Sequence, residues 1–214
     1  MYIYLIHNLI FMALLVIVRH GQSVWNQKNL FTGWADVALT HLGEQEAQHS
    51  GMVLKPYHFD FAFTSVLKRA INTLEIMQQE MKTHLPVIKS EALNERNYGE
   101  LQGLNKGETG LKYGVAQLML WRRSFTEIPP KGESLENTYH RVIPYYEKEI
   151  LPKLSKGKNV LIVAHGNSLR ALMMYLENIK PEEIAHVDLV TGAPKLYEFS
   201  PEMKLLKSEY IKLT

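Results

Sequence analysis

Two apolar runs along the chain end in the same dipeptide. Residues 13–19, ALLVIVR, lead into a His-Gly pair that begins at His20, and residues 159–164, NVLIVA, lead into one that begins at His165. Continuous apolar runs of this length, rich in β-branched residues, are typical of parallel strands buried on both faces. Because the carboxyl ends of parallel strands meet at one edge of a sheet, we expect the two histidines to lie on either side of one pocket.

The rest of the pattern alternates predicted strands with predicted helices. Short runs of alternating or continuous apolar residues indicate strands, and apolar residues three or four positions apart indicate helices. No solenoid-type repeat is present. This order predicts an α/β fold, a three-layer α/β/α sandwich with a mostly parallel central sheet. The expected strands are 13–19, 59–65, 85–90, 159–164, 186–190 and 195–199, and the expected helices are 41–54, 66–81, 114–123, 134–150 and one capped by Ser168.

Local signals refine two of these helices. Thr40 is the expected N-cap of the helix at 41–54, in which Leu42, Ala47 and Val53 would form the buried stripe. The helix at 66–81 carries its apolar face on four residues, namely Leu67, Ala70, Leu74 and Met77.

Two stretches break the helical pattern. Residues 93–110, LNERNYGELQGLNKGETG, show little periodicity and are expected to form a loop. Long irregular loops in compact domains usually serve function. Pro144 should kink the helix at 134–150, because proline lacks an amide N–H and its ring clashes with the preceding turn.

The N-terminus is apolar over its first eighteen residues except for His7 and Asn8. It lacks the basic region and the small-residue cleavage site of a signal peptide. Met12 opens a natural start for the first strand, so residues 1–11 are expected to be an extension and residues 12–214 a single domain. The alternative, a membrane anchor, would place the protein in the membrane pellet after fractionation of cells.

Composition narrows the function classes. The chain has 214 residues and 46% hydrophobic content, which suffices for one core. Lys and Arg number 24 against 22 Asp and Glu, so the small net charge gives no indication of nucleic-acid binding. The absence of cysteine fits a reducing compartment, and a cytoplasmic location is expected. No HExxH-type spacing or acidic triplet occurs, so no metal is expected.

Motifs along nearly the whole chain carry a resemblance to a known family. The RHG that closes the first apolar run and the AHGNS that closes the late one resemble the histidine phosphatase superfamily. Within it, RHGQSVWNQKNLFTGWADVALTHLGEQEA, TSVLKRAINTL, LNERNYGELQGLNK, WRRSF followed by PP, GESLENT and AHGNSLRALM together resemble the cofactor-dependent phosphoglycerate mutases. The resemblance runs from about Leu14 to Phe199 and implies a phosphoglycerate mutase-like catalytic domain. RHG alone is only suggestive, whereas the ordered set is specific.

The resemblance implies which residues carry the chemistry. Phosphoryl transfer between two hydroxyls needs a nucleophile, positive charge around the transferring group, and a proton donor and acceptor. His20 is the implied nucleophile. Arg19, Arg69 and His165 would form the cationic clamp, with His165 as a charged partner instead of a second nucleophile. Glu95 would act as general acid and base.

Other positions in the motifs are implied to bind the substrate. Lys106, Arg122 and Arg123 correspond, together with Tyr98, to residues that hold the carboxylate and the phosphate that is not transferred. An Arg-Arg pair at a helix end is otherwise often a solvated surface. Arg96 is either a substrate contact or a salt-bridge partner that orders its loop. Hydrogen bonds and close backbone approach are expected from Gly21, Gln22, Ser23, Asn26, Thr32, Gly33, Gly166 and Asn167, where Gln22 replaces the Glu of many members.

The implied function is interconversion of 3-phosphoglycerate and 2-phosphoglycerate in glycolysis and gluconeogenesis. It would run through a phosphohistidine enzyme with 2,3-bisphosphoglycerate as cofactor and intermediate, and a homodimer or homotetramer is possible in this family. Two alternatives stay open on the same fold, a phosphomonoesterase that acts on sugar phosphates or a broad range of esters, and a non-catalytic phosphate-binding protein. The short PPKGESL junction and the end at Thr214 omit segments that cover the site in longer members, so some hydrolysis is expected.

Overall fold

The computed structural model describes residues 13–211, so the expected extension at residues 1–11 lies outside the described residues. A single sheet of six strands crosses the molecule in the order β3-β2-β4-β1-β5-β6. Within residues 13–211, no helix has both the length and the apolar composition needed to cross a membrane. The strands are β1 Ala13–Arg19, β2 Phe61–Thr64, β3 Val87–Lys89, β4 Val160–Ala164, β5 Lys195–Phe199 and β6 Leu205–Tyr210.

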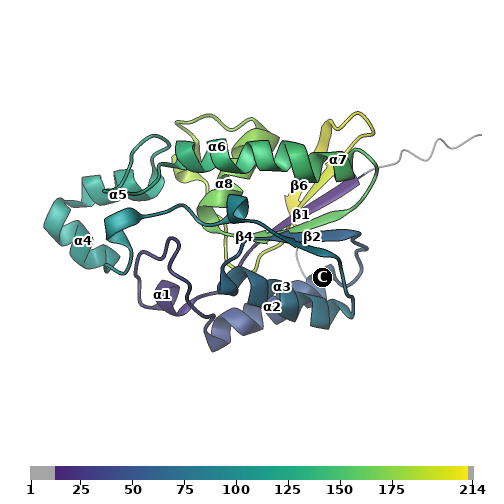
Figure 1. Cartoon of the computed structure of the whole chain (residues 1–214), viewed down its shortest axis with the longest axis horizontal. Helices are drawn as coiled ribbons and strands as arrows, with labels where there is room; N and C mark the ends of the chain where they lie inside the picture. The colour runs from purple at the N-terminus through teal and green to yellow at the C-terminus, as the bar shows by residue number, and fades with distance from the viewer. Residues whose placement is uncertain (1–12, 212–214) are drawn as a thin grey trace, which may run out of the picture.

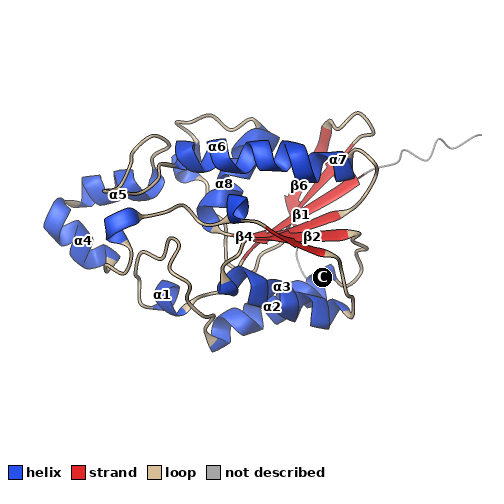
Figure 2. Ribbon diagram, in the orientation of Figure 1, coloured by secondary structure: helices blue, strands red, loops and turns tan. Residues whose placement is uncertain are grey.

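Helices cover both faces of this sheet, which confirms the predicted three-layer α/β/α sandwich (Figures 1 and 2). The helices are α1 Val24–Gln27, α2 His41–Leu54, α3 Lys68–Met81, α4 Lys106–Tyr113, α5 Val115–Arg123, α6 Leu135–Tyr145, α7 Leu151–Leu154 and α8 Gly166–Glu177. α2 and α3 pack on one face, and α6, α7 and α8 lie on the other. α1, α4 and α5 lie beyond one end of the strands, at the left of Figure 1.

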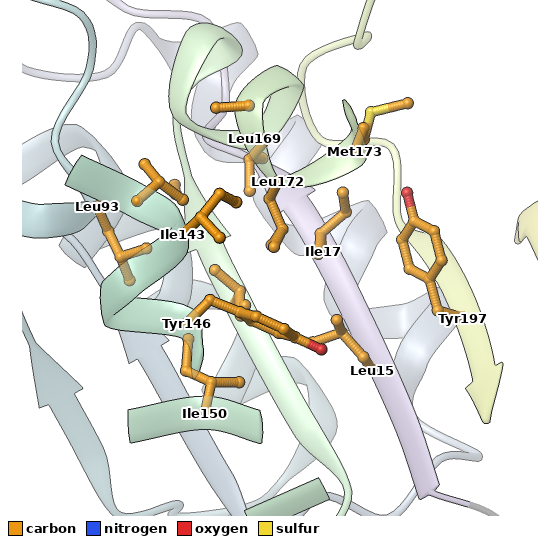
Figure 3. Packing of buried hydrophobic residues seen from close by; sticks show 14 of the residues in the cluster. Leu15, Ile17, Leu93, Ile143, Tyr146, Ile150, Leu169, Leu172, Met173 and Tyr197 are labelled. Atoms are coloured by element: carbon orange, nitrogen blue, oxygen red, sulfur yellow. The ribbon is translucent and has the colours of Figure 1, made fainter. Parts of the chain in front are cut away.

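The burial of the central strand β1 on both faces explains its continuous apolar sequence. Leu15 and Ile17 pack against α6 and α8 in one core cluster, shown in Figure 3, whereas Val16 and Val18 pack toward α2 and α3 in another. All four side chains are fully buried. A strand that is covered on both faces has no polar side, and the sequence therefore shows no alternation.

The pairing of β1 with β4 brings the two His-Gly pairs together. The strands are parallel, with Arg19 opposite Ala164 in the register. The amide of His20 donates to the carbonyl of Ala164 over 3.0 Å, which extends the pairing by one residue. The expectation that both histidines lie at one edge of the sheet is confirmed. β5 pairs antiparallel with β1 and with β6, so the sheet is mixed but mostly parallel.

Helix starts agree with the sequence at some positions and differ at others. Thr40 caps α2 as predicted, since its hydroxyl accepts from the amide of Gly43. Leu42 is 49% exposed, so its assignment to the buried stripe was wrong. Around the helix Leu42 lies only about 20° from the buried Val53, so its exposure follows from its place in the first turn of α2 and not from its face.

The start of α8 lies three residues earlier than the predicted cap. His165 is the N-cap and Ser168 is already inside the helix, where its hydroxyl accepts from the amide of His165. The helix therefore begins directly after the strand end, with no connecting loop.

Pro144 changes the helix in which it lies. α6 ends at Tyr145, and residues Tyr146–Ile150 continue as a π-helical turn before α7. Proline cannot donate to the carbonyl one turn earlier, so one hydrogen bond of α6 is missing at Pro144. The helix type changes two residues later, and the kink at Pro144 stays a prediction.

Further elements differ from the sequence prediction, which also did not include the short helix α1. The expected loop at 93–110 contains the start of α4, which Asn105 caps by accepting from the amides of Gly107 and Glu108. Residues 186–190 do not form a strand, since His186 ends a 3-10 helix at Ile184–His186 and residues 187–190 are irregular. β6 was not predicted, and all six of its residues are exposed.

Candidate active site

His20 lies at the carboxyl end of β1 and is 2% exposed. Its Nδ1 contacts the carbonyl oxygen of Gly21 over 2.7 Å, and Arg69 Nε donates to its Nε2 over 3.2 Å. A carbonyl can only accept and a guanidinium can only donate, so the proton belongs on Nδ1 and the lone pair on Nε2. Burial, followed by Arg69 and Arg19, lowers the pKa of His20 well below its usual value. The ring is therefore a neutral imidazole with its nucleophilic nitrogen directed at Arg69.

Arg69 is held rigidly in this position. It is 1% exposed, and its terminal nitrogens donate to the carbonyls of Ala35 and Gly33 over 2.9 and 2.8 Å. Burial lowers the pKa of Arg69 to about 10, which leaves it charged at neutral pH. Gly33 has a φ of 55°, and a Cβ there would meet the Gln102 side chain at 2.1 Å. Glycine is thus required at the turn that anchors Arg69.

His165, which follows β4, lies next to His20. The ring centroids are 5.0 Å apart, and His165 is fully buried. Burial, then Arg69 and His20, lowers the pKa of His165 well below its usual value. The imidazole is therefore neutral here, whereas the sequence analysis expected a charged partner. An additional negative charge beside it would be needed to favour protonation.

Glu95 is placed between the two strand ends by backbone groups. Its Oε1 accepts from the amides of Arg96 and Asn167 over 2.8 and 2.9 Å. Asn167 is in the first turn of α8, where the helix dipole also favours a negative charge. A Cβ on Gly166 would lie 3.6 Å from Glu95 Oε2 and 3.7 Å from Arg19 Nε. The free carboxylate oxygen and the arginine therefore share the space above Gly166.

His20, Arg69 and Glu95 line one cavity of about 130 Å³, whereas the predicted site residue His165 does not line it. Lys106, at the start of α4, and the pair Arg122 and Arg123, at the end of α5, lie on its outer wall. Burial, then Arg122 and Arg19, lowers the pKa of Lys106 to about 8. The predicted site residues that line the cavity are Arg19, His20, Asn26, Thr32, Gly33, Arg69, Glu95, Tyr98, Lys106, Arg122, Arg123, Gly166 and Asn167.

Other predicted residues lie behind the cavity wall. Gly21 packs against α2, since a Cβ there would lie 2.1 Å from the carbonyl oxygen of Gly43, and its amide donates to Thr73. Gln22 accepts from the hydroxyl of Thr40. Ser23 is the N-cap of α1. These residues shape the loop that follows His20.

Arg96 orders its loop through a different partner from the one expected. It is fully buried, and its NH2 donates to the carbonyls of Trp121 and Arg122 and to the hydroxyl of Tyr98. The geometry favours the loop-ordering alternative over substrate contact, with helix C-terminal carbonyls in place of a carboxylate.

The cavity also contains residues that the sequence analysis missed. Arg170 donates to the side-chain oxygen of Asn167 over 3.0 Å, and its Nε is a buried donor without a partner among the described residues. Its position three residues after Asn167 on one helix is a signal that could have revealed it. Asp188 and Leu189 come from the segment that was assigned to a strand.

Several buried polar atoms in and around the cavity make no hydrogen bond within the described part of the chain. They include Arg19 Nε and Thr32 Oγ1, on residues that line the cavity, and His165 Nδ1, on a residue beside it. Ser65 contacts the other nitrogen of His165 over 2.7 Å. Buried polar atoms rarely stay unpaired, so unpaired groups here mark a place for a bound acceptor. A phosphoryl group, with its three acceptor oxygens and negative charge, fits these groups.

The chain belongs to the histidine phosphatase superfamily, since the family model of branch 1 matches residues 15–209. A 2,3-bisphosphoglycerate-dependent phosphoglycerate mutase of Cytophaga hutchinsonii is 68% identical over 202 residues, which cover 94% of this chain and 95% of the relative. A phosphoglycerate mutase of Schizosaccharomyces pombe is 50% identical over 201 residues, which cover 92% and 95%. The resemblance carried by the sequence motifs is confirmed.

Solved structures share the fold at lower identity. The structure of mycobacterial hydrolase 1 gives a TM-score of 0.80 at 22% identity and covers 95% of this chain and 100% of its own. A mycobacterial glucosyl-3-phosphoglycerate phosphatase in complex with VO3 gives 0.78 at 24% identity, covering 94% and 100%. At this level of identity the likeness establishes the fold alone.

Proposed function

We propose that this chain interconverts 3-phosphoglycerate and 2-phosphoglycerate, with His20 as the residue that carries the phosphoryl group. The observation that carries the proposal is the cavity in which a neutral, oriented His20 faces Arg69, with further cations on the outer wall. The names of the relatives at 68% and 50% identity support the same activity.

The cavity fits a ligand with two anionic ends. Arg19, Arg69 and the unpaired donors surround His20, whereas Lys106 and Arg122 lie on the outer wall. A phosphate ester of glycerate has its carboxylate and its phosphate on neighbouring carbons or one carbon apart, so one molecule can contact both groups. When bound, 2,3-bisphosphoglycerate would supply the phosphoryl group that first loads His20.

The first transfer moves the phosphoryl group from His20 to the substrate. The free hydroxyl oxygen of 3-phosphoglycerate attacks the phosphorus on Nε2, so that an O–P bond forms and the N–P bond breaks. Glu95 Oε2 takes the proton from the hydroxyl. Arg69 Nε, which donates to Nε2 in the unphosphorylated protein, donates to a phosphoryl oxygen when Nε2 carries phosphorus, and its charge stabilises the transition state.

The second transfer returns a phosphoryl group from the other oxygen. Nε2 of His20 attacks that phosphorus, an N–P bond forms and the O–P bond breaks. Glu95 returns its proton to the leaving oxygen, which gives 2-phosphoglycerate. His20 is then phosphorylated again, as a ping-pong cycle requires.

The phosphatase alternative is less well supported. A simple phosphomonoesterase does not require groups for a second anion, and Lys106, Arg122 and Arg123 all line the cavity. Hydrolysis as a side reaction depends on access of water to phosphorylated His20. We also propose a cytoplasmic location, which the absence of cysteine supports. The oligomeric state stays a prediction.

One assay tests the proposal against both alternatives. The protein is incubated with 3-phosphoglycerate and a catalytic amount of 2,3-bisphosphoglycerate, and 2-phosphoglycerate and free phosphate are measured together. We expect formation of 2-phosphoglycerate that depends on the bisphosphate. Release of phosphate alone would identify a phosphatase, and the absence of either product would identify a binding protein.

A further inference from the structure

In one wall of the cavity, the negatively charged side chain of Asp188 pairs with Arg123, which is a proposed substrate ligand. Arg123 donates to both carboxylate oxygens of Asp188, over 2.8 Å to Oδ1 and 3.1 Å to Oδ2. This bidentate arrangement uses the two donors that a substrate carboxylate would use in the same way. The hydrogen bond to Asp188 raises the pKa of Arg123, and Arg123 lowers that of Asp188, so both are charged at neutral pH.

The charge of Asp188 is unusual for its surroundings. The cavity is lined by Arg19, Arg69, Lys106, Arg122, Arg123 and Arg170, and the lining carboxylates are Glu95 and Asp188. Glu95 is fixed by two backbone amides and has a place in the proton transfers. Asp188 touches neither His20 nor Glu95 through any hydrogen bond within the described residues. Its defined polar partner is the guanidinium of Arg123.

The side chain of Asp188 can turn while the backbone around it stays in place. Residues 188–190 belong to no helix or strand, and their amides donate to no acceptor within residues 13–211. The backbone is fixed on both sides of Asp188, by the amide of Val187 on the carbonyl of Ile184 before it and by Arg19 NH1 on the carbonyl of Leu189 after it. Asp188 itself is 71% exposed in its side chain, whereas Arg123 is 25% exposed. The carboxylate can therefore turn into solvent while Arg123 stays in the wall.

We propose that the carboxylate of Asp188 competes with the carboxylate of the substrate for Arg123. The substrate displaces Asp188 from Arg123 on binding, and Asp188 pairs with Arg123 again when the ligand leaves or turns. This inference rests on the proposed function, and within the set Lys106, Arg122, Arg123 and Tyr98 it assigns the substrate carboxylate to Arg123. Asp188 would thus set the affinity for glycerate phosphates without contacting the reacting atoms. The return of Asp188 to Arg123 also helps a bisphosphorylated ligand to dissociate from Arg123 and reverse its orientation between the two transfers.

Asp188 lowers the affinity for a ligand only if that ligand has a carboxylate that binds Arg123. Binding of 3-phosphoglycerate requires the ion pair to open, whereas sn-glycerol 3-phosphate, which has a hydroxymethyl group in place of the carboxylate, leaves it closed. A ligand that does not distinguish the open from the closed pair cannot be affected by it. The two compounds therefore form a matched pair of probes.

The test is isothermal titration of the enzyme, freed of bound phosphates and at low salt, with each probe. We expect Asp188→Asn and Asp188→Ala to bind 3-phosphoglycerate about two- to fivefold more tightly than the unchanged protein, the range for a largely exposed ion pair. Binding of sn-glycerol 3-phosphate should not change. Glu209→Gln, which removes the same charge from the exposed strand β6, is the control and should alter neither affinity.

A second background separates this inference from the proposed role of Arg123. In Arg123→Gln, 3-phosphoglycerate should bind more weakly, and adding Asp188→Asn should then have no effect. The proposed competition is refuted if Asp188→Asn and Asp188→Ala, in the native background, bind 3-phosphoglycerate as tightly as the unchanged protein or more weakly. It is also refuted if the affinities for both probes rise equally. Unchanged binding by Arg123→Gln alone would instead refute the role of Arg123.

Discussion

The direction of the His20 ring decides which atom can react. The carbonyl of Gly21 holds Nδ1 as a donor, so Nε2 is left with its lone pair. A neutral ring buried among arginines does not have to lose a proton before it attacks a phosphorus atom. Orientation and protonation are thus both set before a substrate binds, which is how fixed groups lower a barrier.

Replacing the nucleophile tests this assignment. We expect His20→Ala to abolish labelling of the protein by 2,3-bisphosphoglycerate that is radioactive in its phosphates, and to lower kcat by about 10⁴-fold or more, as for other covalent catalysts. The measurement is protein-bound label after rapid gel filtration. His41→Ala is the matched control, because His41 is 85% exposed at the start of α2 and should keep full labelling. Label retained in His20→Ala would exclude His20.

At the level of single residues, motifs predicted the positions that face the cavity better than those that support it. His20, Arg69 and Glu95 follow from short quoted stretches. Asp188 could not be assigned, because its partner Arg123 is 65 residues away in the chain. Such a pair becomes visible only when the fold places the end of α5 beside residues 187–190.

Two helices near the site depend on their caps, and one of them carries a proposed substrate ligand. Asn105 caps α4, whose first residue is Lys106, and Ser134 caps α6 with a reciprocal contact to Asn137. Loss of an N-cap costs a helix about 1 kcal/mol. Both helices have a side-chain N-cap, but only α4 begins at a residue that lines the cavity, Lys106.

Removing each cap separates stability from binding. We expect Asn105→Ala to raise KM for 3-phosphoglycerate by up to about fivefold, because fraying of the first turn of α4 displaces Lys106. Ser134→Ala should lower the free energy of unfolding by about 1 kcal/mol and leave KM unchanged. Steady-state kinetics and urea unfolding give both quantities. An equal KM in the two variants would argue against Lys106 as a ligand.

At the level of elements, the hydrophobic pattern predicted what is well packed. β1 and β4, which are buried on both faces, and α3, which is buried on one, were found because burial dictates their sequences. α4 was missed because Gly107 and Gly110 interrupt its pattern, although Gly110 allows close packing on Leu118, from which a Cβ would be 3.0 Å away. β6 was missed because a fully exposed edge strand has no apolar face to detect.

For the whole molecule, two buried neutral histidines make stability depend on pH. Folding keeps the pKa values of His20 and His165 below those of the unfolded chain, about 6.5. The unfolded state therefore binds more protons below that pH, and stability falls as the pH is lowered. Above about pH 7 both states are neutral at these positions and the effect disappears.

The size of this dependence can be measured. We expect the free energy of unfolding in phosphate-free buffer to fall by about 2–3 kcal/mol between about pH 7.5 and 5.5, from two groups at up to about 1.4 kcal/mol per pH unit each. In His20→Ala the fall should be about half as large. Urea unfolding at several pH values gives the result, and a stability independent of pH in this range would contradict it.

The place of β1 between β4 and β5 has a consequence for how the molecule opens. Neither edge of the sheet can fray as far as the amide of His20, which is hydrogen-bonded to Ala164. That amide should exchange with deuterium only when the entire domain unfolds, whereas the amides of residues 188–190 should exchange within the first moments. The enzyme thus combines its slowest-exchanging backbone, at the nucleophile, with some of its fastest, at the wall facing it.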